Sequence, residues 1–498
     1  MALQFHNTLS GRVEEFQPLE DLKVRMYTCG PTVYDFAHIG NFRTFVFQDI
    51  LRRHLKYRGY QVNQVMNLTD VDDRTIANSQ AAGVPLRDYT AKFIEAFQAD
   101  RDLLGLDPPE RLVRATDHIE PMVRLIETLV QKGFAYESDG SYYFRVKNFS
   151  DYGKLSKIDF SGIKDGARVD TDKYDKADAR DFVLWKAAKE GEPCWETALG
   201  SGRPGWHIEC SVMAMTYLGE TIDIHSGGSD LVFPHHENEI AQSEAATGKP
   251  FARFWLHAEH LIVNGGKMSK SLGNFYTLRD LIALGYPPTA IRYLLASVPY
   301  RKPLNFSLEG LQQARQAIER LRNFHYRLTT QKFPAGQNSD LQAKARAGAE
   351  AFGQALDDNL NTAEALGAIF NLVRDGNTAM DAGEFRDGDR AAFLDALERW
   401  DMIFAVLDDR DYDKLKKYGL VKEEPSVVRL EADLREAGGG NGAGRVTLGE
   451  QEIERLVSER NHARQNRNFA RADQIRDELL DAGVILEDTR NETRWKRK

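Results

Sequence analysis

A buried strand is predicted at Val24-Arg25-Met26-Tyr27-Thr28-Cys29, where a short apolar run closes on Gly30-Pro31. Residues 42–56 then carry apolar side chains at helical spacing, and residues 61–68 predict a second strand. This strand–helix–strand order favours an α/β fold with a doubly wound, Rossmann-like parallel sheet. In such sheets ligands bind beyond the carboxyl ends of the strands, which is where Cys29 falls.

Two segments far apart in the sequence predict a clamp for a triphosphate. His38-Ile39-Gly40-Asn41 stands at the start of the predicted helix, and Lys267-Met268-Ser269-Lys270-Ser271 lies between Gly265-Gly266 and Gly273. Neutral donors at a helix N-terminus and a mobile pair of lysines would hold phosphate oxygens from two sides. The lysine segment alone could be a solvated basic loop, but its pairing with the His38 segment favours the clamp.

Length, composition and charge narrow the classes of protein to which the chain can belong. The chain has 498 residues, of which 42% are hydrophobic and 28% charged, as in a globular protein with about three or four domains. Its net charge of −9 counts against a strongly basic nucleic-acid binder, although a local basic patch is compatible with it. We expect no membrane segment, because no apolar run is long enough and the N-terminus lacks a signal-peptide core. The three cysteines cannot form a disulfide framework, so we expect a cytoplasmic location.

The rest of the chain divides into further segments. An Asp139-Gly140 turn inside an aromatic-rich run predicts a hairpin, and residues 182–185 predict another strand, so an α+β segment interrupts the nucleotide-binding domain. Asn361, followed by Glu364, predicts a capped helix in a later helical region. The expected boundaries are 1–115 and 201–271 for the two halves of the Rossmann-like domain, 116–200 for the insertion, 272–325 for the region after the lysine loop, 326–436 for a helical bundle, 437–444 for a Gly-rich linker and 445–498 for a small C-terminal module.

A metal site is suggested by His235 and Glu239. Pro234 fits the first turn of a helix, which would put these two side chains, four residues apart, on one face. Cys29 and Cys210, at strand ends of the two half-domains, could complete a Cys, Cys, His, Glu set that suits zinc. The pattern alone leaves open a second interpretation, in which both cysteines are ordinary buried apolar side chains.

These motifs resemble those of a known family. Residues 38–41 and 267–271 resemble the two signatures of the class I aminoacyl-tRNA synthetases; Asn41 stands where a second His is usual, and its amide can still donate to a phosphate oxygen. Cys29, Gly205–Cys210, Phe233–Glu239 and Asn67–Asp73 resemble the cysteinyl-tRNA synthetase family, with Arg74 where Lys is common. The resemblance runs from about residue 7 to the C-terminus.

The resemblance implies roles for individual residues. One Zn²⁺ per chain would be bound by Cys29, Cys210, His235 and Glu239, whereas Cys194 matches no ligand position. ATP, as its Mg²⁺ complex, would contact His38, Asn41, Asp230, Lys267 and Lys270, of which all but Asp230 would be catalytic. Tyr27, Thr69, Trp206 and His225 would lie near the amino acid. Asp230 would bind either the amine of the amino acid or the ribose of ATP.

The implied reaction has two steps. L-Cysteine and ATP give cysteinyl-adenylate and pyrophosphate, and the 3′-terminal ribose of tRNA(Cys) then takes the cysteinyl group. A purely apolar pocket separates near-isosteres such as cysteine and serine by only about 1–3 kcal/mol. Zinc favours a thiolate over a hydroxyl as ligand, so no editing domain is required.

The C-terminal region bears on the choice between functions. Arginines 460, 464, 467 and 471 recur at helical spacing, with a possible break at residues 466–468, and the tail Arg494-Trp495-Lys496-Arg497-Lys498 mixes cations with an aromatic ring. The resemblance implies an anticodon-binding module here and a stem-contact role for residues 272–325. A solvated helix face is the alternative, because acidic residues offset the arginines.

Two other functions compete with the tRNA ligase. One is a related ligase that passes activated cysteine to the amine of an amino-sugar; it would lack the C-terminal module. The other is a zinc-stabilised RNA-binding scaffold, which would not need the phosphate clamp. We expect a monomeric tRNA ligase.

Overall fold

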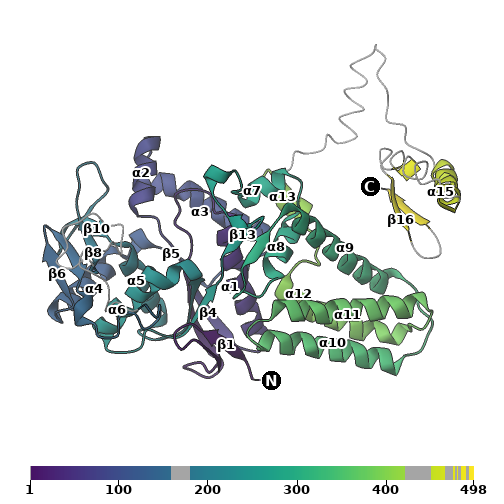
Figure 1. The fold of residues 1–498 in the computed structure, drawn as a ribbon, viewed down its shortest axis with the longest axis horizontal. Coiled ribbons are helices and arrows are strands. Elements are labelled where there is room, and N and C mark those ends of the chain that lie inside the picture. Colours follow the sequence, from purple (N-terminus) through teal and green to yellow (C-terminus); the bar gives the residue numbers. More distant parts are fainter. Residues whose placement is uncertain are drawn as a thin grey trace, which may run out of the picture. The chain divides into compact units, whose positions relative to one another are not determined.

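The computed structural model describes residues 2–158, 180–420, 450–465, 475–476, 479, 484–488 and 493–497, and the chain forms two compact units, residues 1–422 and 423–498. The centre of the first unit is a five-stranded sheet of order β12-β11-β3-β4-β5, in which every neighbouring pair is parallel (Figure 1). Its strands are β3 (Lys23–Thr28), β4 (Gln61–Leu68), β5 (Arg111–Arg114), β11 (Ile222–Gly228) and β12 (Ala252–Ala258).

The predicted strand–helix–strand unit is confirmed. Helix α1 (Ile39–Tyr57) connects β3 to β4, and α2 (Asp73–Ala82) and α3 (Leu86–Leu103) connect β4 to β5. In the sheet, β4 and β5 follow β3 on one side, and β12 follows β11 on the other side. The direction in which strands are added therefore reverses between the adjacent strands β3 and β11. A crevice for ligands is expected where the carboxyl ends of such strands diverge.

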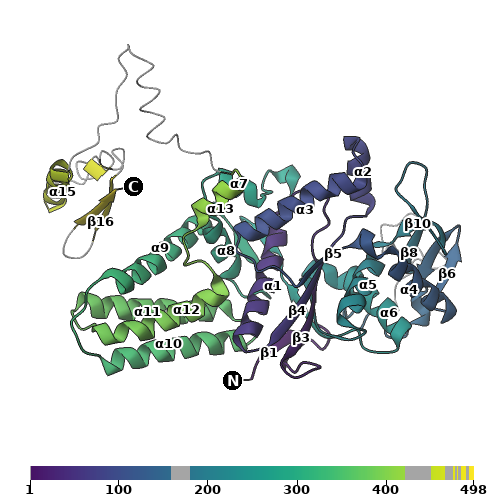
Figure 2. The same ribbon diagram turned by 180° about the vertical axis from the view of Figure 1, so that it is seen from behind.

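The segment between the two halves of this sheet forms a separate layer at one end of the unit (Figures 1 and 2). Helix α4 (Ile119–Gln131) packs beside an antiparallel sheet of order β6-β7-β8-β10-β9. Asp139 and Gly140 both have positive φ, 50° and 76°, as a two-residue type I′ hairpin requires, so the predicted hairpin is confirmed. The strands are β6 (Ala135–Ser138), β7 (Ser141–Phe144), β8 (Phe182–Ala187), β9 (Trp195–Thr197) and β10 (Gly200–Pro204).

The second half of the sheet brings its own helices, and a small sheet follows. α5 (Trp206–Leu218) precedes β11, and α6 (Glu237–Thr247) connects β11 to β12. The small sheet has the order β14-β13-β15, with β13 (Leu261–Val263), β14 (Gly266–Lys267) and β15 (Leu304–Phe306). A two-stranded ribbon, β1 (Gln4–Asn7) and β2 (Arg12–Glu15), lies near the N-terminus.

Helices form the other end of the first unit (Figure 2). They are α7 (Leu278–Ala283), α8 (Pro288–Ala296), α9 (Leu308–Thr330), α10 (Ser339–Asp357), α11 (Thr362–Asp381), α12 (Arg390–Phe404) and α13 (Asp411–Lys417). The side chain of Asn361 caps α11 by accepting from the backbone N–H of Glu364, as predicted. Both α8 and α12 contact α1, so α1 lies between the sheet and the helical layer. Its buried side chains therefore include charged ones such as Arg43 and Asp49.

A buried ion-pair network ties these layers together. Arg292 of α8 is 1% exposed and lies 2.6 Å from Asp49 of α1, which also pairs with Arg53 at 2.8 Å. Arg292 also donates to the carbonyl groups of Leu104 and Ile403, near the ends of α3 and α12. A buried charge with this many partners holds the helices in one arrangement, because removing a partner would leave the charge uncompensated.

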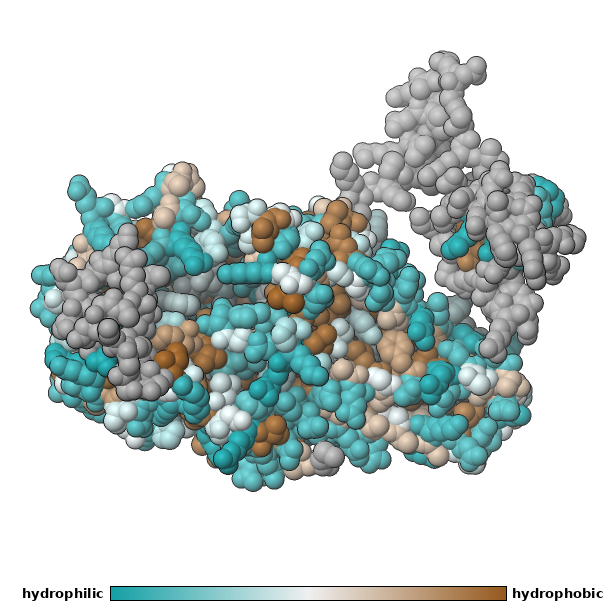
Figure 3. Space-filling model, in the orientation of Figure 1, coloured by the Kyte–Doolittle hydropathy of each residue, from teal (hydrophilic) through white to brown (hydrophobic). Residues whose placement is uncertain are grey.

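The face of the first unit seen in Figure 3 is mostly polar. Figure 3 shows hydrophilic side chains over most of the face in view, with the hydrophobic ones scattered between them. Isolated apolar side chains of this kind are ordinary on proteins. Among the described residues no helix has both the length and the apolar character that crossing a membrane requires.

The second unit has a small core of its own. Helix α15 (Glu450–Gln465) contributes Ile453, Leu456 and Val457, which pack with Ile475, Leu479 and Val484. Strands β16 (Val484–Asp488) and β17 (Thr493–Arg497) pair antiparallel.

The predicted arginine stripe needs one correction in this unit. Arg460 is only 5% exposed, because it lies on the face of α15 that covers the core, so it cannot belong to an outward-facing stripe. The described part of this helix runs to Gln465, and the predicted break at residues 466–468 lies outside the described residues. Arg467 and Arg471 lie outside the described residues, and so do the side chains of Arg464 and of the C-terminal tail.

Candidate active site and metal centre

The N-terminus of α1 is shaped by His38 and Asn41. His38 is the N-cap, and its Nδ1 accepts from the backbone N–H of Asn41 at 3.2 Å, while Asn41 Oδ1 accepts from the backbone N–H of His38 at 3.1 Å. This reciprocal cap uses one polar atom of each side chain. His38 Nε2 and Asn41 Nδ2 remain as donors for an anion at the positive end of the helix dipole.

The imidazole of His38 is held neutral by its surroundings. Burial lowers its pKa, and the ammonium group of Lys270 lowers it further, against the opposing effect of Asp230. Since Nδ1 accepts a hydrogen bond, the single proton of the neutral ring lies on Nε2. The predicted neutral donor is therefore supported by the geometry of the cap.

The lysine segment forms a loop closed by Asn274. The backbone N–H of Ser269 donates to Asn274 Oδ1 at 2.8 Å, and Asn274 Nδ2 donates to the carbonyl oxygen of Lys267 at 3.1 Å. Gly265 and Gly273 flank the loop with φ of 78° and 65°, a region that favours glycine. Both Lys267 and Lys270 are exposed.

The fold brings the two predicted phosphate segments together. The backbone N–H of Ile39 donates to the carbonyl oxygen of Tyr276 at 3.0 Å, and a Cβ on Gly40 would lie 3.3 Å from the terminal methyl group of Met268. The ammonium group of Lys270 lies 5.1 Å from the centre of the Phe275 ring, which also contacts the ring of His38. Donors from a helix end and cations from a loop thus border one space.

Four predicted metal ligands also come together, at the switch between β3 and β11. Cys29 follows β3, as predicted, whereas the prediction that Cys210 lies at a strand end is wrong, because it lies inside α5. His235 lies in the turn Val232–His236, and Glu239 is in the first turn of α6. One ligand atom from each lies within 4.8 Å of the other three, and all four residues are buried. Pro234 lies in the first turn of a helical run, as predicted: Phe233 is extended (φ −138°, ψ 134°), and the helical backbone that resumes at Pro234 continues into α6 (Glu237–Thr247). His235 Nε2 lies 3.0 Å from Glu239 Oε1.

This group of atoms fits zinc. In a tetrahedral zinc site with bonds of about 2.0–2.3 Å, the ligand atoms are roughly 3.3–3.8 Å apart, which is inside the observed span. Glu239 Oε1 finds no hydrogen-bond donor of suitable geometry among the described residues, although His235 Nε2 is close to it. Two buried ligand atoms that approach without hydrogen bonding are well placed to share a cation.

The charges of the group also call for a cation. Burial raises the pKa of the Cys210 thiol, but a hydrogen bond from Cys29 and the charge of His235 outweigh burial and lower it to about 6. Burial also raises the pKa of Glu239, yet His225 and His235 lower it to about 2. His235 compensates these anions: burial lowers its pKa, but Glu239 and Cys210 raise it to about 10. A divalent metal would replace this proton.

Histidines that the sequence analysis did not single out surround the group. His236 Nε2 lies 3.3 Å from Cys29 Sγ, His236 Nδ1 lies 2.8 Å from His257 Nε2, and His257 Nδ1 lies 2.8 Å from the hydroxyl group of Thr8. If Cys29 accepts as a thiolate, His236 and His257 must each donate through Nε2 and accept at Nδ1. The hydroxyl group of Thr8 is then the donor to Nδ1 of His257. The adjacent pair His235-His236 was the available sequence signal for this arrangement.

A second group of four could also hold a metal ion. It consists of Cys29, His225, His236 and Glu239, so it shares two members with the first group. The first group contains both buried cysteines, and thiolates are preferred zinc ligands. His225 and His236 are then outer residues that orient Glu239 and Cys29 through contacts of 2.8 Å and 3.3 Å.

The predicted pocket residues take different positions around the group. Trp206 is 39% exposed and stacks on His235 with ring centres 4.2 Å apart, so it forms a wall. Tyr27 and His225 are fully buried, behind the group, with their ring centres 5.2 Å apart. Thr69, also buried, follows β4 at the same edge of the sheet. Asp230 is exposed, and it is near enough to His38 and to Cys29 for its charge to raise the pKa of both.

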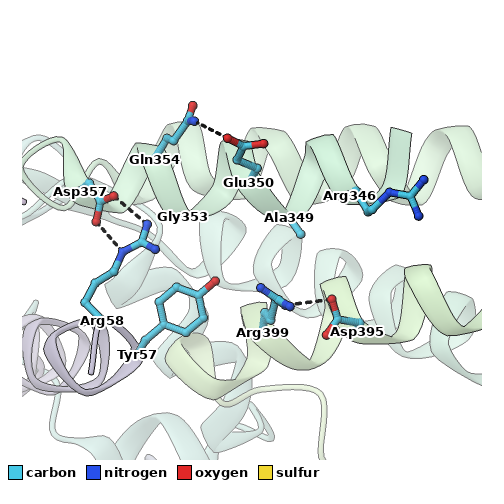
Figure 4. Close-up of a pocket in the computed structure, with 10 residues that line it drawn as sticks. All are labelled: Tyr57, Arg58, Arg346, Ala349, Glu350, Gly353, Gln354, Asp357, Asp395 and Arg399. Atoms are coloured by element: carbon cyan, nitrogen blue, oxygen red, sulfur yellow. Dashed lines mark hydrogen bonds and ion pairs between the residues drawn. The ribbon is translucent and has the colours of Figure 1, made fainter. Parts of the chain in front are cut away.

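Another cavity lies elsewhere on the first unit. It has a volume of about 460 Å³ and lies beside the C-terminal end of α1, α10 and α12 (Figure 4). Arg58 pairs with Asp357 there and Arg399 with Asp395, so these four charged side chains of the cavity are already paired with one another. Helix α1, with 19 residues, puts roughly 28 Å between this cavity and His38. The cavity is therefore separate from the phosphate and metal groups.

Three family models match successive parts of the chain. The family model of the class I (C) tRNA synthetase catalytic domain matches residues 15–316, that of the DALR domain matches residues 351–408, and that of the cysteinyl-tRNA ligase anticodon-binding domain matches residues 449–495.

Individual proteins are similar over their full length. A cysteine–tRNA ligase of Solibacter usitatus (strain Ellin6076) is 57% identical over 498 residues, and one of Koribacter versatilis (strain Ellin345) is 54% identical over 500 residues; 100% of each protein and 100% of this chain are covered. Among solved structures, Mycobacterium tuberculosis methionyl-tRNA synthetase in complex with methionyl-adenylate has a TM-score of 0.57 at 16% identity, covering 82% of this chain and 96% of its own. This last likeness shows a shared fold.

Metal content tests the four-residue group. We expect Cys210→Ser to lower the bound metal, measured by mass spectrometry of the purified protein, because it removes a buried ligand. Cys194→Ser is the matched control and should retain full metal, since Cys194 is exposed and belongs to neither group. Full metal content in a Cys29→Ala, Cys210→Ala double variant would exclude this group.

The affinity for the metal should increase with pH. Without metal, His235 carries a proton at neutral pH because its pKa is raised to about 10, and it must lose this proton to become a ligand. Below pH 10 each unit of pH should therefore raise the affinity by about tenfold for each proton released. Competition with a chelator, measured from pH 6 to 9, tests the slope; an affinity that does not vary with pH would contradict the assignment of His235.

Proposed function

This chain belongs to the cysteine–tRNA ligase family, and we propose how its residues divide the work of the reaction. The protein activates L-cysteine with ATP as cysteinyl-adenylate and transfers the cysteinyl group to tRNA. The assignment of residues rests on one observation: the metal-binding group and the phosphate clamp meet at the same switch point of the parallel sheet. Cysteine-dependent exchange of pyrophosphate into ATP, followed by charging of tRNA, tests the reaction directly.

The first step needs positioning rather than a protein base. The cysteine carboxylate is already ionised; its oxygen forms a bond to the α-phosphorus, and the bond from that phosphorus to the bridging oxygen breaks, releasing pyrophosphate with the electron pair. Catalysis then consists of alignment and charge stabilisation. We assign His38 Nε2 and Asn41 Nδ2 to phosphate oxygens. Lys270, helped by Lys267, stabilises the charge that develops on the leaving pyrophosphate.

We assign one Zn²⁺ per chain to Cys29, Cys210, His235 and Glu239. Zinc held there would supply a coordination position that favours a thiolate over a hydroxyl and so selects cysteine against serine. His236 orients Cys29, and His225 orients Glu239, through the contacts described above. Trp206, stacked on His235, covers the open side of the group and limits access of water.

The remaining pocket residues take supporting roles in this proposal. Tyr27 and Thr69 form the buried floor beside Cys29 and β4. The exposed carboxylate of Asp230 lies near His38 and Cys29, where it can accept hydrogen bonds from the ammonium group of cysteine or from the ribose of ATP. We therefore place Asp230 at the junction of the two substrates.

The other segments would serve the tRNA. We propose that residues 272–325 contact its stem and that the module from about residue 445 binds the anticodon, in accordance with the matched anticodon-binding domain. An amino-sugar ligase is not supported, because this match extends to residue 495 and the full-length relatives are tRNA ligases. We further propose a monomer in the cytoplasm, where reducing conditions keep Cys29 and Cys210 as thiols.

The role of Lys270 has a kinetic test. We expect Lys270→Ala to slow pyrophosphate exchange by about 10²–10³-fold and to leave cysteine binding nearly unchanged, because the contact acts in the transition state. Lys249→Ala is a matched control: it removes an exposed lysine that pairs with Glu220 away from the site. Exchange within about threefold of the parent, or roughly 0.7 kcal/mol, would show that the loop is not catalytic.

The role of the C-terminal module has a separate test. A chain that ends after Ala437 should still form cysteinyl-adenylate, because every residue assigned to that step belongs to the first unit. The truncated chain should charge tRNA poorly, because it lacks cations that would contact the phosphates of the tRNA. The full-length protein keeps these cations, so its affinity for tRNA should fall more steeply with added salt than that of the truncated chain. Equal charging by the two proteins across the salt range would exclude an RNA-binding role for the module.

A further inference from the structure

We propose that Asp35 holds Lys270 in a resting position when no nucleotide is bound, and that the phosphates of ATP displace this carboxylate. The proposal rests on the role given to Lys270 above. In this proposal the carboxylate of Asp35 competes with the phosphates of ATP for Lys270. The affinity for ATP therefore depends on how much more strongly Lys270 binds the phosphates than the carboxylate.

The contact between these residues is direct. Lys270 Nζ lies 2.7 Å from Asp35 Oδ2, and both side chains reach solvent, with exposed fractions of 67% and 39%. The other carboxylate oxygen, Oδ1, accepts from the backbone N–H of Phe36 at 2.8 Å. The orientation of the carboxylate is thus set by its own backbone, and Oδ2 is left for the lysine.

Asp35 lies on a segment that contacts with three other elements hold in place. The hydroxyl group of Tyr89 donates to the carbonyl oxygen of Tyr34 at 2.8 Å, and the guanidinium group of Arg74 lies 5.3 Å from the centre of the Tyr34 ring. The backbone N–H of Val33 donates to the carbonyl oxygen of Thr69 at 3.1 Å. Helices α2 and α3 and the end of β4 therefore hold this segment from three directions.

Lys270 lies on a loop that is able to move. Its loop lies between Gly265 and Gly273, both with positive φ, and its side chain is mostly exposed. Asn274, the residue after Gly273, bonds to Ser269 and to Lys267, so residues 267–274 can shift as a body. The ion pair thus joins a fixed anion to a mobile cation, and the cation is the partner that can leave.

The position of Asp35 makes it a competitor for ATP. It lies three residues before His38, whose Nε2 we assign to the phosphates, so carboxylate and phosphates would share one neighbourhood. An ammonium group that pairs with Asp35 in the free protein must give up this contact to reach the pyrophosphate. Exposed pairs of this kind are weak, so a triphosphate can displace the carboxylate.

The substitution Asp35→Asn tests this competition. We expect the variant to bind α,β-methylene ATP, which cannot be cleaved at the reacting bond, about two- to fivefold more tightly than the parent, the range that an exposed ion pair allows. The kcat of pyrophosphate exchange should remain within about twofold. Without nucleotide, trypsin should cut after Lys267 and Lys270 faster in the variant, because the loop has lost its tie.

Matched variants separate the explanations. Glu20→Gln removes the same charge from an exposed pair with Lys23 and should leave nucleotide binding unchanged. In a Lys270→Ala background, Asp35→Asn should no longer alter nucleotide binding, because the pair is already absent. The difference between parent and variant should also shrink at high salt. Asp35→Ser is a second variant, in case Asp35→Asn folds poorly.

Two results would overturn the proposal. Unchanged nucleotide binding together with a lowered kcat in Asp35→Asn would show that Asp35 positions Lys270 for the reaction. Tighter binding that persists in the Lys270→Ala background would show a general charge effect. A Lys270→Ala variant with normal exchange would instead refute the catalytic role of the lysine, while the tryptic cleavage would still report whether Asp35 holds the loop.

Discussion

The reciprocal hydrogen bonds between His38 and Asn41 are the constraint on which the site depends. They fix the first turn of α1, the helix that lies between the parallel sheet and the helical layer. Because the cap uses Nδ1 of His38 and Oδ1 of Asn41, it decides which atoms of these side chains remain for a ligand. One local motif therefore sets both a helix boundary and the donors of a phosphate site. The usual second histidine can be an asparagine here because either residue can cap and donate.

The four residues that could hold a metal ion place acidic side chains in a buried position, where a cation would be favourable. Cys210 and Glu239 are acidic and buried, so their charges need compensation. In the metal-free group a proton on His235 provides it, whereas His236 and His257 offer only hydrogen bonds because burial keeps them neutral: burial lowers the pKa of His236 well below its usual value and that of His257 to about 3. In the proposed function a metal ion would meet the same need with a higher charge and would leave a position at which a thiolate can be recognised.

The two halves of the site are coupled to the rest of the molecule in different ways. The metal ligands come from strand ends and from α5 and α6, which are packed on the sheet, so their positions are rigid. The lysine loop is exposed, which suits the closure on ATP that we propose for it. The network of Arg292 and Asp49 joins the sheet to the helices, so the segment that precedes the RNA-binding module is held against the catalytic core.

A family resemblance pointed to the residues that we assign to both halves of the site. The sequence by itself determined the parallel sheet, the hairpin at Asp139-Gly140 and the cap of Asn361. These follow from local patterns: apolar runs, turn residues and the spacing of polar side chains. Only the tertiary structure decided that His236, His257 and Thr8 line up behind Cys29, that Arg460 faces a core and that Asp35 meets Lys270. Each of these depends on which distant segments are adjacent in space, and long-range adjacency leaves no period or motif along the chain.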